Sequence, residues 1–294
     1  MKDKLWLLFI LITVVTWGIW GAFSDLQMGR DGIPETVVYI LWALSMVPCA
    51  IVALIINKGK LQTDWKSILL GCTVGLLGAG GQLVLFKALA IGPAYIIFPF
   101  ISMSPVIVIT LAAIFLKEKA TNWQIAGIVV ALAAILLLSI QTGGGEGPVS
   151  GWLWILLAVL VLCAWGIQGF FMKFANNSMD AESIFVWMAI SGLVLIPFAW
   201  FMQSEPMTAP EFFAGADVTV KSLKCLGIQS LNSIGALTLV YAYRYGKAVI
   251  VSPMEGLSPM VTVLLSLIIL SVIPTPLQIG GICCAAFAMY ALSK

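Results

Sequence analysis

Long apolar runs recur along the whole chain, and each is about as long as a helix that crosses a membrane. A helix of about 20 residues spans a hydrocarbon core of roughly 30 Å. The composition agrees, because 61% of the 294 residues are hydrophobic and 10% are charged, with a mean hydropathy of +1.08. The sequence predicts an all-α polytopic membrane protein whose ten transmembrane helices start near Leu5, Thr36, Lys66, Ala94, Asn122, Gly151, Ala181, Ser222, Ala248 and Pro274.

Almost no sequence remains for a soluble domain, so we expect no extramembrane enzyme. The longest connection, about 203–221, contains Pro206, Pro210 and Gly215 and is predicted to be a loop or a short interfacial segment. The chain has no histidine and no CxxC pair, so we expect no metal site and no cofactor. Its few basic residues are scattered among short loops, which gives no nucleic-acid-binding pattern.

The basic residues nevertheless predict an orientation. With ten spans, one side of the membrane carries the N-terminus together with most of the lysines and arginines in short loops, and the other side carries only Arg30, Lys87, Lys221 and Lys224. Cytoplasmic loops are enriched in lysine and arginine. Both termini are therefore predicted to be cytoplasmic, in the cell (inner) membrane.

Two similar sequences occur in the two parts of the chain. GPAYIIFPFISMSP from Gly92 matches GKAVIVSPMEGLSP from Gly246, which pairs Pro99 with Pro253 and Pro105 with Pro259 at an offset of 154 residues. The same offset pairs WQIAG from Trp123 with LQIGG from Leu277. Upstream, TWGIWGAF, which contains Trp17, matches AWGIQGFF, which contains Trp165, at an offset of 148. The pattern indicates a duplicated chain.

The duplication predicts two five-helix repeats, residues 1–141 and 151–294, with the Gly-rich segment 142–150 between them. A second copy that follows five membrane crossings enters the membrane from the opposite side, so the repeats should have inverted topology. Inverted repeats are typical of secondary transporters, which work by alternating access. Duplication for packing alone is the alternative.

The segment ALAIGPAYIIFPFISMSPVIVITLAAIFLKEKATNWQIAG, together with its second copy, resembles the core of the EamA-type transporters of the drug/metabolite transporter superfamily. This resemblance covers nearly the whole chain. It implies ten helices in two inverted repeats, cytoplasmic termini, and a central cavity lined by helices 1, 3, 4, 6, 8 and 9. Members commonly move amino acids, other metabolites, sugars or drug-like compounds. The glutamate of the family pattern is Glu118 in the first copy, whereas the second copy has Val272.

Paired prolines in the fourth and ninth spans predict broken helices. Proline lacks a backbone donor and clashes with the preceding turn, so Pro99, Pro105, Pro253 and Pro259 should kink or break these helices. At membrane depth a break is tolerated beside protein or a watery cavity, which points to a binding site. A packing kink is the alternative.

Glu255 is the acidic residue between the prolines of the second copy, where the first copy has Ile101. A carboxylate at membrane depth costs about 2.5–3.5 kcal/mol to insert, so it needs a partner or a function. Two interpretations stay open. Glu255 forms a structural ion pair with Lys173, Arg244 or Lys247, or it binds substrate or couples protons, in which case transport should depend on pH.

Other polar and aromatic side chains within the predicted spans complete the set of candidates. Trp17 and Trp20, and likewise Trp165 and Gln168, are three residues apart and share a helix face. Facing inward, they offer stacking surfaces and hydrogen-bond donors to a ligand, whereas an outward-facing Trp20 at the membrane interface is the alternative. Small residues four apart are predicted to form two helix-packing seams, Gly71 with Gly75 and Ala79, and Gly280 with Cys284 and Ala288. The remaining cavity candidates are Gln82, Lys87, Ser102, Asn232, Tyr241 and Ser258, although snorkelling to the membrane surface is an alternative role for Lys87.

The sequence thus predicts a secondary transporter of a small organic solute, with export of amino acids or related metabolites as the leading hypothesis. Proton-coupled uptake of a sugar-like solute, or a passive channel or lipid scramblase, are the alternatives. The expected partners are the lipid bilayer and the solute, with or without a coupled proton. The sequence predicts no oligomeric state.

Overall fold

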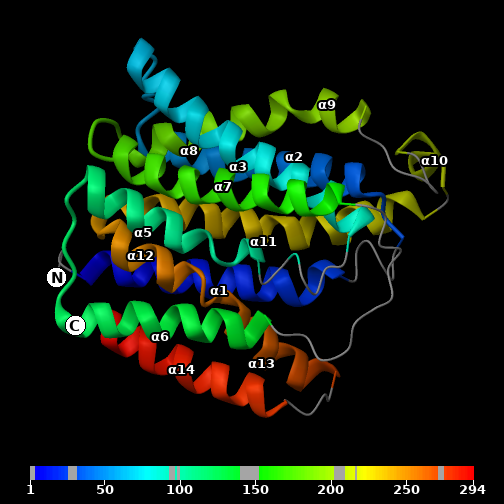
Figure 1. The fold of residues 1–294 in the computed structure, drawn as a ribbon. Helices are drawn as coiled ribbons and strands as arrows, with labels where there is room; N and C mark the ends of the chain where they lie inside the picture. Colours follow the sequence, from blue (N-terminus) through cyan, green and yellow to red (C-terminus); the bar gives the residue numbers. More distant parts are fainter. Residues whose placement is uncertain are drawn as a thin grey trace.

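The structure is a computed structural model that describes residues 4–25, 32–92, 97, 100–139, 152–201, 209–215, 217–270 and 275–294. These residues form helices, and no strand occurs among them. The helices lie side by side across the molecule, and the first begins at the end of the bundle where the last one finishes (Figure 1). They are α1 (Leu5–Asp25), α2 (Glu35–Ile56), α3 (Trp65–Ile91), α5 (Ser104–Phe115), α6 (Asn122–Ser139), α7 (Leu153–Ala175), α8 (Ala181–Val194), α9 (Ile196–Phe201), α10 (Ala209–Phe213), α11 (Val218–Tyr245), α12 (Ala248–Glu255), α13 (Ser258–Leu270) and α14 (Pro276–Leu292).

The helices suit a lipid environment. Within the described ranges, 7 stretches are long and apolar enough to cross a membrane, namely α1, α2, α3, α7, α8 with α9, α11, and α12 with most of α13. Large apolar side chains face outward, for example Ile55 (70% exposed) and Phe201 (85% exposed). The chain is therefore an integral, multi-pass membrane protein. Three further apolar helices, α5, α6 and α14, are shorter, and the predicted start of the fourth span at Ala94 lies outside the described residues.

Side chains near the helix starts explain part of the repeated sequence. Before α6, the Thr121 backbone N–H donates to Gln124 Oε1 (2.9 Å), and the Gln124 N–H donates to Thr121 Oγ1 (3.2 Å). Thr275 and Gln278 exchange the same two bonds before α14. This capping box satisfies two orphan donors at each helix start. The repeated glutamine therefore serves to begin the fifth helix of each predicted repeat.

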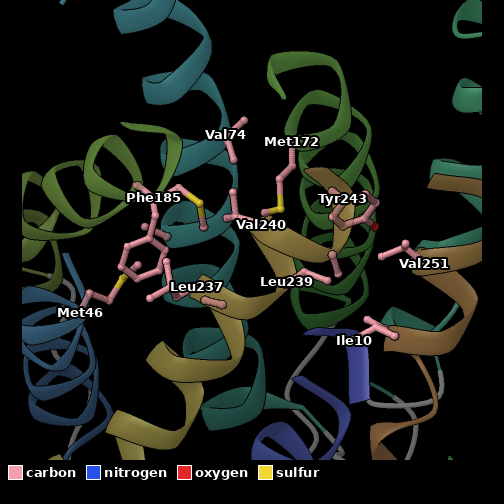
Figure 2. Close-up of a cluster of buried hydrophobic side chains, with 14 of the residues drawn as sticks. Ile10, Met46, Val74, Met172, Phe185, Leu237, Leu239, Val240, Tyr243 and Val251 are labelled. Atoms are coloured by element: carbon pink, nitrogen blue, oxygen red, sulfur yellow. The ribbon is translucent and has the colours of Figure 1, made fainter. Parts of the chain in front are cut away.

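Helix α11 runs through the centre of the bundle. It contacts α1, α2, α7, α8 and α12, and its side chains Leu237, Leu239, Val240 and Tyr243 meet residues of these neighbours (Figure 2). Contacts in the first part of the chain have counterparts in the second part. Helix α1 packs on α11 and α13, and α7 packs in the same way on α3 and α5. Likewise, α2 packs on α11 and α8 packs on α3. Helices α6 and α14 lie against each other at one edge (Figure 1).

Glycines let several of these helices approach closely. A Cβ on Gly71 would meet the Trp187 side chain, and one on Gly75 would lie 2.5 Å from Ser191 Oγ, so both glycines form the predicted seam, here against α8. The predicted seam in α14 is wrong at Gly280, which has no atom within 4 Å of an added Cβ, whereas Gly281 faces Leu138 of α6. The other two seam positions face the protein, because Cys284 packs against the core and Ala288 is completely buried.

The seam between α3 and α8 makes a prediction for Gly75→Ala. The new methyl group would lie 2.9 Å from the Met188 Cα as well as close to Ser191, so the helices must move apart. We expect a loss of about 1–3 kcal/mol of stability. Gly80→Ala, on the same helix with no atom within 4 Å, should instead gain about 0.5–1 kcal/mol from helix propensity. Thermal unfolding of the purified protein in detergent checks the pair, and equal melting temperatures for the two variants would contradict the seam.

Candidate functional site

The break in the ninth predicted span lies directly after Glu255. Helix α12 ends at Glu255, Gly256 and Leu257 form a turn, and α13 begins at Ser258 with Pro259 as its second residue. The turn satisfies its own donors, because Gly256 N–H donates to Ser252 O (3.2 Å) and Leu257 N–H donates to Met254 O (3.1 Å). Pro253 lies inside α12 and does not end it. The helix is therefore interrupted just before Pro259, one of the four prolines at which the sequence predicts a kink or break.

The first copy has a turn at the corresponding place. Residues 102 and 103 form a turn before α5, which begins at Ser104 with Pro105 in its first turn, 154 residues before Ser258 and Pro259. Pro99 lies outside the described residues. The two breaks meet in space, because a Cβ on Gly256 would lie 3.3 Å from Pro105 Cγ and 2.5 Å from Ile135 Cδ1. Helices α5 and α12 therefore cross near their turns.

At this crossing, the Glu255 carboxylate is half-buried and accepts a hydrogen bond from a tyrosine. The Tyr243 hydroxyl donates to Glu255 Oε2 (3.2 Å), and Tyr243 is completely buried. Glu255 forms no ion pair with any residue that the structure describes. Of the two interpretations open at the sequence level, the structural ion pair does not occur in this structure.

The basic residues proposed as ion-pair partners bond to backbone carbonyls instead. Lys173 Nζ donates to Tyr243 O (3.0 Å) and Gly246 O (2.6 Å) at the end of α11. Arg244 donates to Asn176 O (2.6 Å) and Met179 O (2.7 Å) just after α7. Cations at helix C-termini satisfy orphan carbonyls and interact favourably with the helix dipole. These charges therefore hold together the ends of α7 and α11 beside the Tyr243–Glu255 pair.

Tryptophans of the first and seventh helices make matching contacts. Trp17 Nε1 donates to Asn232 O (3.0 Å) of α11, and Trp165 Nε1 donates to Gly78 O (3.4 Å) of α3. The donors are 148 residues apart and the acceptors 154 residues apart, which are the two offsets found in the sequence. The tryptophan rings lie over Gly235 and Gly81, respectively, which are also 154 residues apart.

The EamA-like transporter family matches residues 4–140 and again residues 152–294. The chain belongs to the EamA-like transporter family. A probable terminal-alkyne amino-acid exporter of Streptantibioticus cattleyicolor is 27% identical over 281 residues, which cover 92% of this chain and 88% of that protein. An uncharacterized protein of Methanocaldococcus jannaschii is 31% identical over 131 residues, 45% of this chain and 93% of that protein.

A solved structure, titled only as the crystal structure of a protein, shares the fold of this EamA-like transporter. Its TM-score is 0.78 at 15% sequence identity, and the match covers 99% of this chain and 96% of that chain. At this identity the likeness concerns the fold alone.

In this EamA-like transporter, Glu118 caps the N-terminal end of α12, the helix that breaks after Glu255. Glu118 Oε2 accepts a hydrogen bond from the Val249 backbone N–H (3.1 Å) in the first turn of α12, whose own N-cap, Lys247, makes no side-chain cap. Lys247 Nζ in turn donates to Lys119 O (2.8 Å). A carboxylate at a helix N-terminus is favoured by the dipole. The glutamate of the family pattern thus tethers the α5–α6 connection to α12.

The remaining candidates fall into two groups. Several are held in bonds between helices: Trp20 Nε1 donates to Gln229 Oε1 (3.0 Å), Trp42 Nε1 donates to Asn232 Oδ1 (2.7 Å), and the Tyr241 hydroxyl donates to Glu182 Oε1 (2.7 Å). The rest are not joined to Glu255 by any hydrogen bond between described residues; they are Gln82, Lys87, Ser102, Gln168 and Ser258.

Sequence reasoning missed the partners that these candidates use. Tyr243 shares α11 with the candidate Tyr241, but nothing in the local sequence pairs it with Glu255. Trp42 and Glu182 come from α2 and α8, from which no candidate was drawn. The one available signal was the spacing of Tyr241, Tyr243 and Tyr245 near the end of an apolar helix, which marks three aromatic hydroxyl groups close to the same interface.

The Glu118 cap makes a prediction about the start of α12. Glu118→Ala removes the acceptor for the Val249 N–H and should lower stability by about 1 kcal/mol, as the loss of an N-cap does. Glu118→Gln keeps an oxygen acceptor at the same place and should retain most of it. Thermal unfolding in detergent measures both. A Gln variant as unstable as the Ala variant would show that the charge, not the hydrogen bond, matters.

Proposed function

We propose that this member of the EamA-like transporter family is a secondary transporter that exports amino acids or related metabolites by alternating access. In this proposal ten transmembrane helices form two inverted five-helix repeats, residues 1–141 and 151–294, joined by residues 142–150. Both termini face the cytoplasm across the cell (inner) membrane. The protein has no enzymatic role.

The inverted-repeat arrangement is supported by contacts that recur between the proposed halves. Gly18 of α1 lies against Val261 of α13, and Gly166 of α7 lies against Ile107 of α5. The two glycines are 148 residues apart and their partners are 154 residues apart, so one contact is the counterpart of the other. The double match to the family, once in each half, also supports this arrangement.

The observation that carries the transport proposal is the crossing of the broken helices at Glu255. Broken helices with matching turns are the usual place of substrate sites in transporters with inverted repeats. Glu255 lies at that crossing and accepts a hydrogen bond from Tyr243 without an ion pair to a described residue. An unpaired intramembrane carboxylate of this kind is suited to bind a cationic group or to exchange a proton.

Amino acids are the proposed substrates because one relative along most of the chain carries the name of an amino-acid exporter. Proton-coupled uptake of a sugar-like solute is the second candidate, favoured by the same carboxylate.

The test is counterflow of labelled amino acids and sugars into proteoliposomes that contain a pH-sensitive dye. We expect saturable amino-acid counterflow that falls at least tenfold in Glu255→Gln. Glu182→Gln is the matched control, because Glu182 is also half-buried and also accepts a hydrogen bond from a tyrosine, Tyr241, but lies away from the break. It should keep most of the counterflow.

Each other result has a definite meaning. Flux without saturation or counterflow would indicate a channel or scramblase and contradict the proposal. Saturable sugar counterflow with proton movement would replace it with the second candidate. Counterflow that is equal in Glu255→Gln and in the native protein would remove Glu255 from the transport site.

A further inference from the structure

The buried hydroxyl of Tyr243 lies between α12 and α7. It donates to Glu255 Oε2 of α12 (3.2 Å), and Tyr243 is completely buried. A Cβ added to Gly169 of α7 would lie 3.0 Å from this hydroxyl and 2.9 Å from Val108 Cγ2 of α5. The hydroxyl therefore occupies a space that stays open because residue 169 has no side chain.

Helix α7 also holds the backbone of Tyr243. Lys173 follows Gly169 by four residues, so the two lie on the same face of α7. Lys173 Nζ donates to Tyr243 O (3.0 Å), and Gly169 lies against the hydroxyl at the other end of the residue. Because the ring is buried between these two contacts, α7 determines where the hydroxyl meets Glu255.

The donor and the acceptor of this hydrogen bond occur together in the second copy of the repeated sequence. At the offset of 154 residues, Leu89 corresponds to Tyr243 and Ile101 corresponds to Glu255. The first copy therefore replaces both members of the pair by apolar residues. This joint replacement is expected if the tyrosine serves the carboxylate.

The glycine contact, in contrast, has a counterpart in each copy. A Cβ on Gly21 of α1 would lie 2.8 Å from Thr262 Oγ1 of α13. Gly21 precedes Gly169 by 148 residues, and Val108 precedes Thr262 by 154 residues. Close helix approach at this glycine is thus common to both copies, and the second copy uses the same place to seat a tyrosine hydroxyl.

We propose that Tyr243 is a positioning residue for the substrate and that Gly169 provides the space that its hydroxyl needs. The hydroxyl holds Glu255 through Oε2, which leaves Oε1 to bind the ammonium group of an amino acid. A carboxylate that is held in place before binding loses less freedom when the ligand arrives. The inference rests on the proposed function for its substrate class, and it adds the two residues that set the geometry at Glu255.

The test is amino-acid counterflow in proteoliposomes over a range of substrate concentrations, which separates KM from the maximal rate. Tyr243→Phe keeps the ring and removes the donor, and it should raise KM about tenfold, as the loss of one hydrogen bond to a charged group does. The maximal rate should change much less, because substrate still fills the site at high concentration. Tyr245→Phe is the matched control, since Tyr245 lies on the same helix but is 49% exposed and stacks on Phe9. It should leave KM unchanged.

Gly169→Ala tests the space beside the hydroxyl. The new methyl group meets both Tyr243 and Val108, so it is combined with Val108→Ala, which removes the second contact and leaves the first. The pair should raise KM relative to Val108→Ala alone. In Tyr243→Phe the hydroxyl is absent, so the same glycine change should have no further effect. Gly21→Ala, which crowds the counterpart contact away from Glu255, should leave KM unchanged.

Infrared spectroscopy of the purified protein reads the hydrogen bond without transport. The carboxylate band that disappears in Glu255→Gln should shift in Tyr243→Phe and in the Gly169→Ala, Val108→Ala pair, but not in Tyr245→Phe. A band and a KM that are both unchanged in Tyr243→Phe would overturn the positioning role. Additive effects of the Gly169 and Tyr243 changes would overturn the role of Gly169.

The result is separable from the transport proposal. Amino-acid counterflow with the native KM in Tyr243→Phe would reject the positioning role while the transporter stands. Absence of counterflow in the native protein would reject transport, and the infrared band would still decide the contact. A shifted band then supports the hold of Tyr243 on Glu255, and an unshifted band overturns it.

Discussion

Every backbone N–H and C=O group of a membrane-spanning chain needs a partner inside the protein, because lipid offers none. This chain interrupts its own helices at the crossing of α5 and α12, where that requirement is hardest to meet. The turn at the break satisfies its own donors, because Gly256 N–H donates to Ser252 O and Leu257 N–H donates to Met254 O. Side chains hold the opposite end of α12, where Glu118 caps the start of α12 and Lys173 satisfies the last carbonyls of α11. These bonds leave fewer backbone groups without a partner at the two ends of the short helix α12.

The same constraint ties the proposed halves together. Thr262 Oγ1 donates to Gly18 O (2.9 Å), Tyr39 donates to Gly192 O (3.2 Å), and Trp17 donates to Asn232 O (3.0 Å), each from one half to the other. Hydrogen bonds between membrane helices are individually modest, often below 1 kcal/mol. When helices are joined by many weak hydrogen bonds and by glycine contacts, they can slide and form new contacts without unfolding. This suits a transporter that must open first on one side of the membrane and then on the other.

Much of this architecture was accessible from the sequence because it repeats. The offsets of 148 and 154 residues reappear in the contacts of Trp17 and Trp165, and the two capping boxes explain the repeated glutamine. The helix break was predicted because proline chemistry is local. The family assignment, made from the order of short motifs, is confirmed by the double match across the chain.

Tertiary partners were not accessible. Tyr243 meets Glu255 only because α11 and α12 fold against each other after Gly246, a geometry that no local pattern encodes. An ion pair between Glu255 and a nearby basic residue was one of two interpretations open from the sequence, but Lys173 and Arg244 donate instead to carbonyls at the ends of α7 and α11, at 2.6–3.0 Å. In α14 the seam was assigned Gly280 in place of Gly281, since spacing alone allows either residue and only the position of α6 decides.

The measurement that tests the central claim most directly is a pair of spin-label distances between the proposed halves, one at each end of the bundle. Cysteines replace the exposed Lys119 and Asn177 at the end where α12 begins, and the exposed Leu136 and Lys224 at the other end, in a chain without its native cysteines. Alternating access predicts that adding the amino acid found in counterflow shifts the two distances in opposite directions. If each labelled pair shows one distance that does not change at saturating substrate, the result would contradict alternating access.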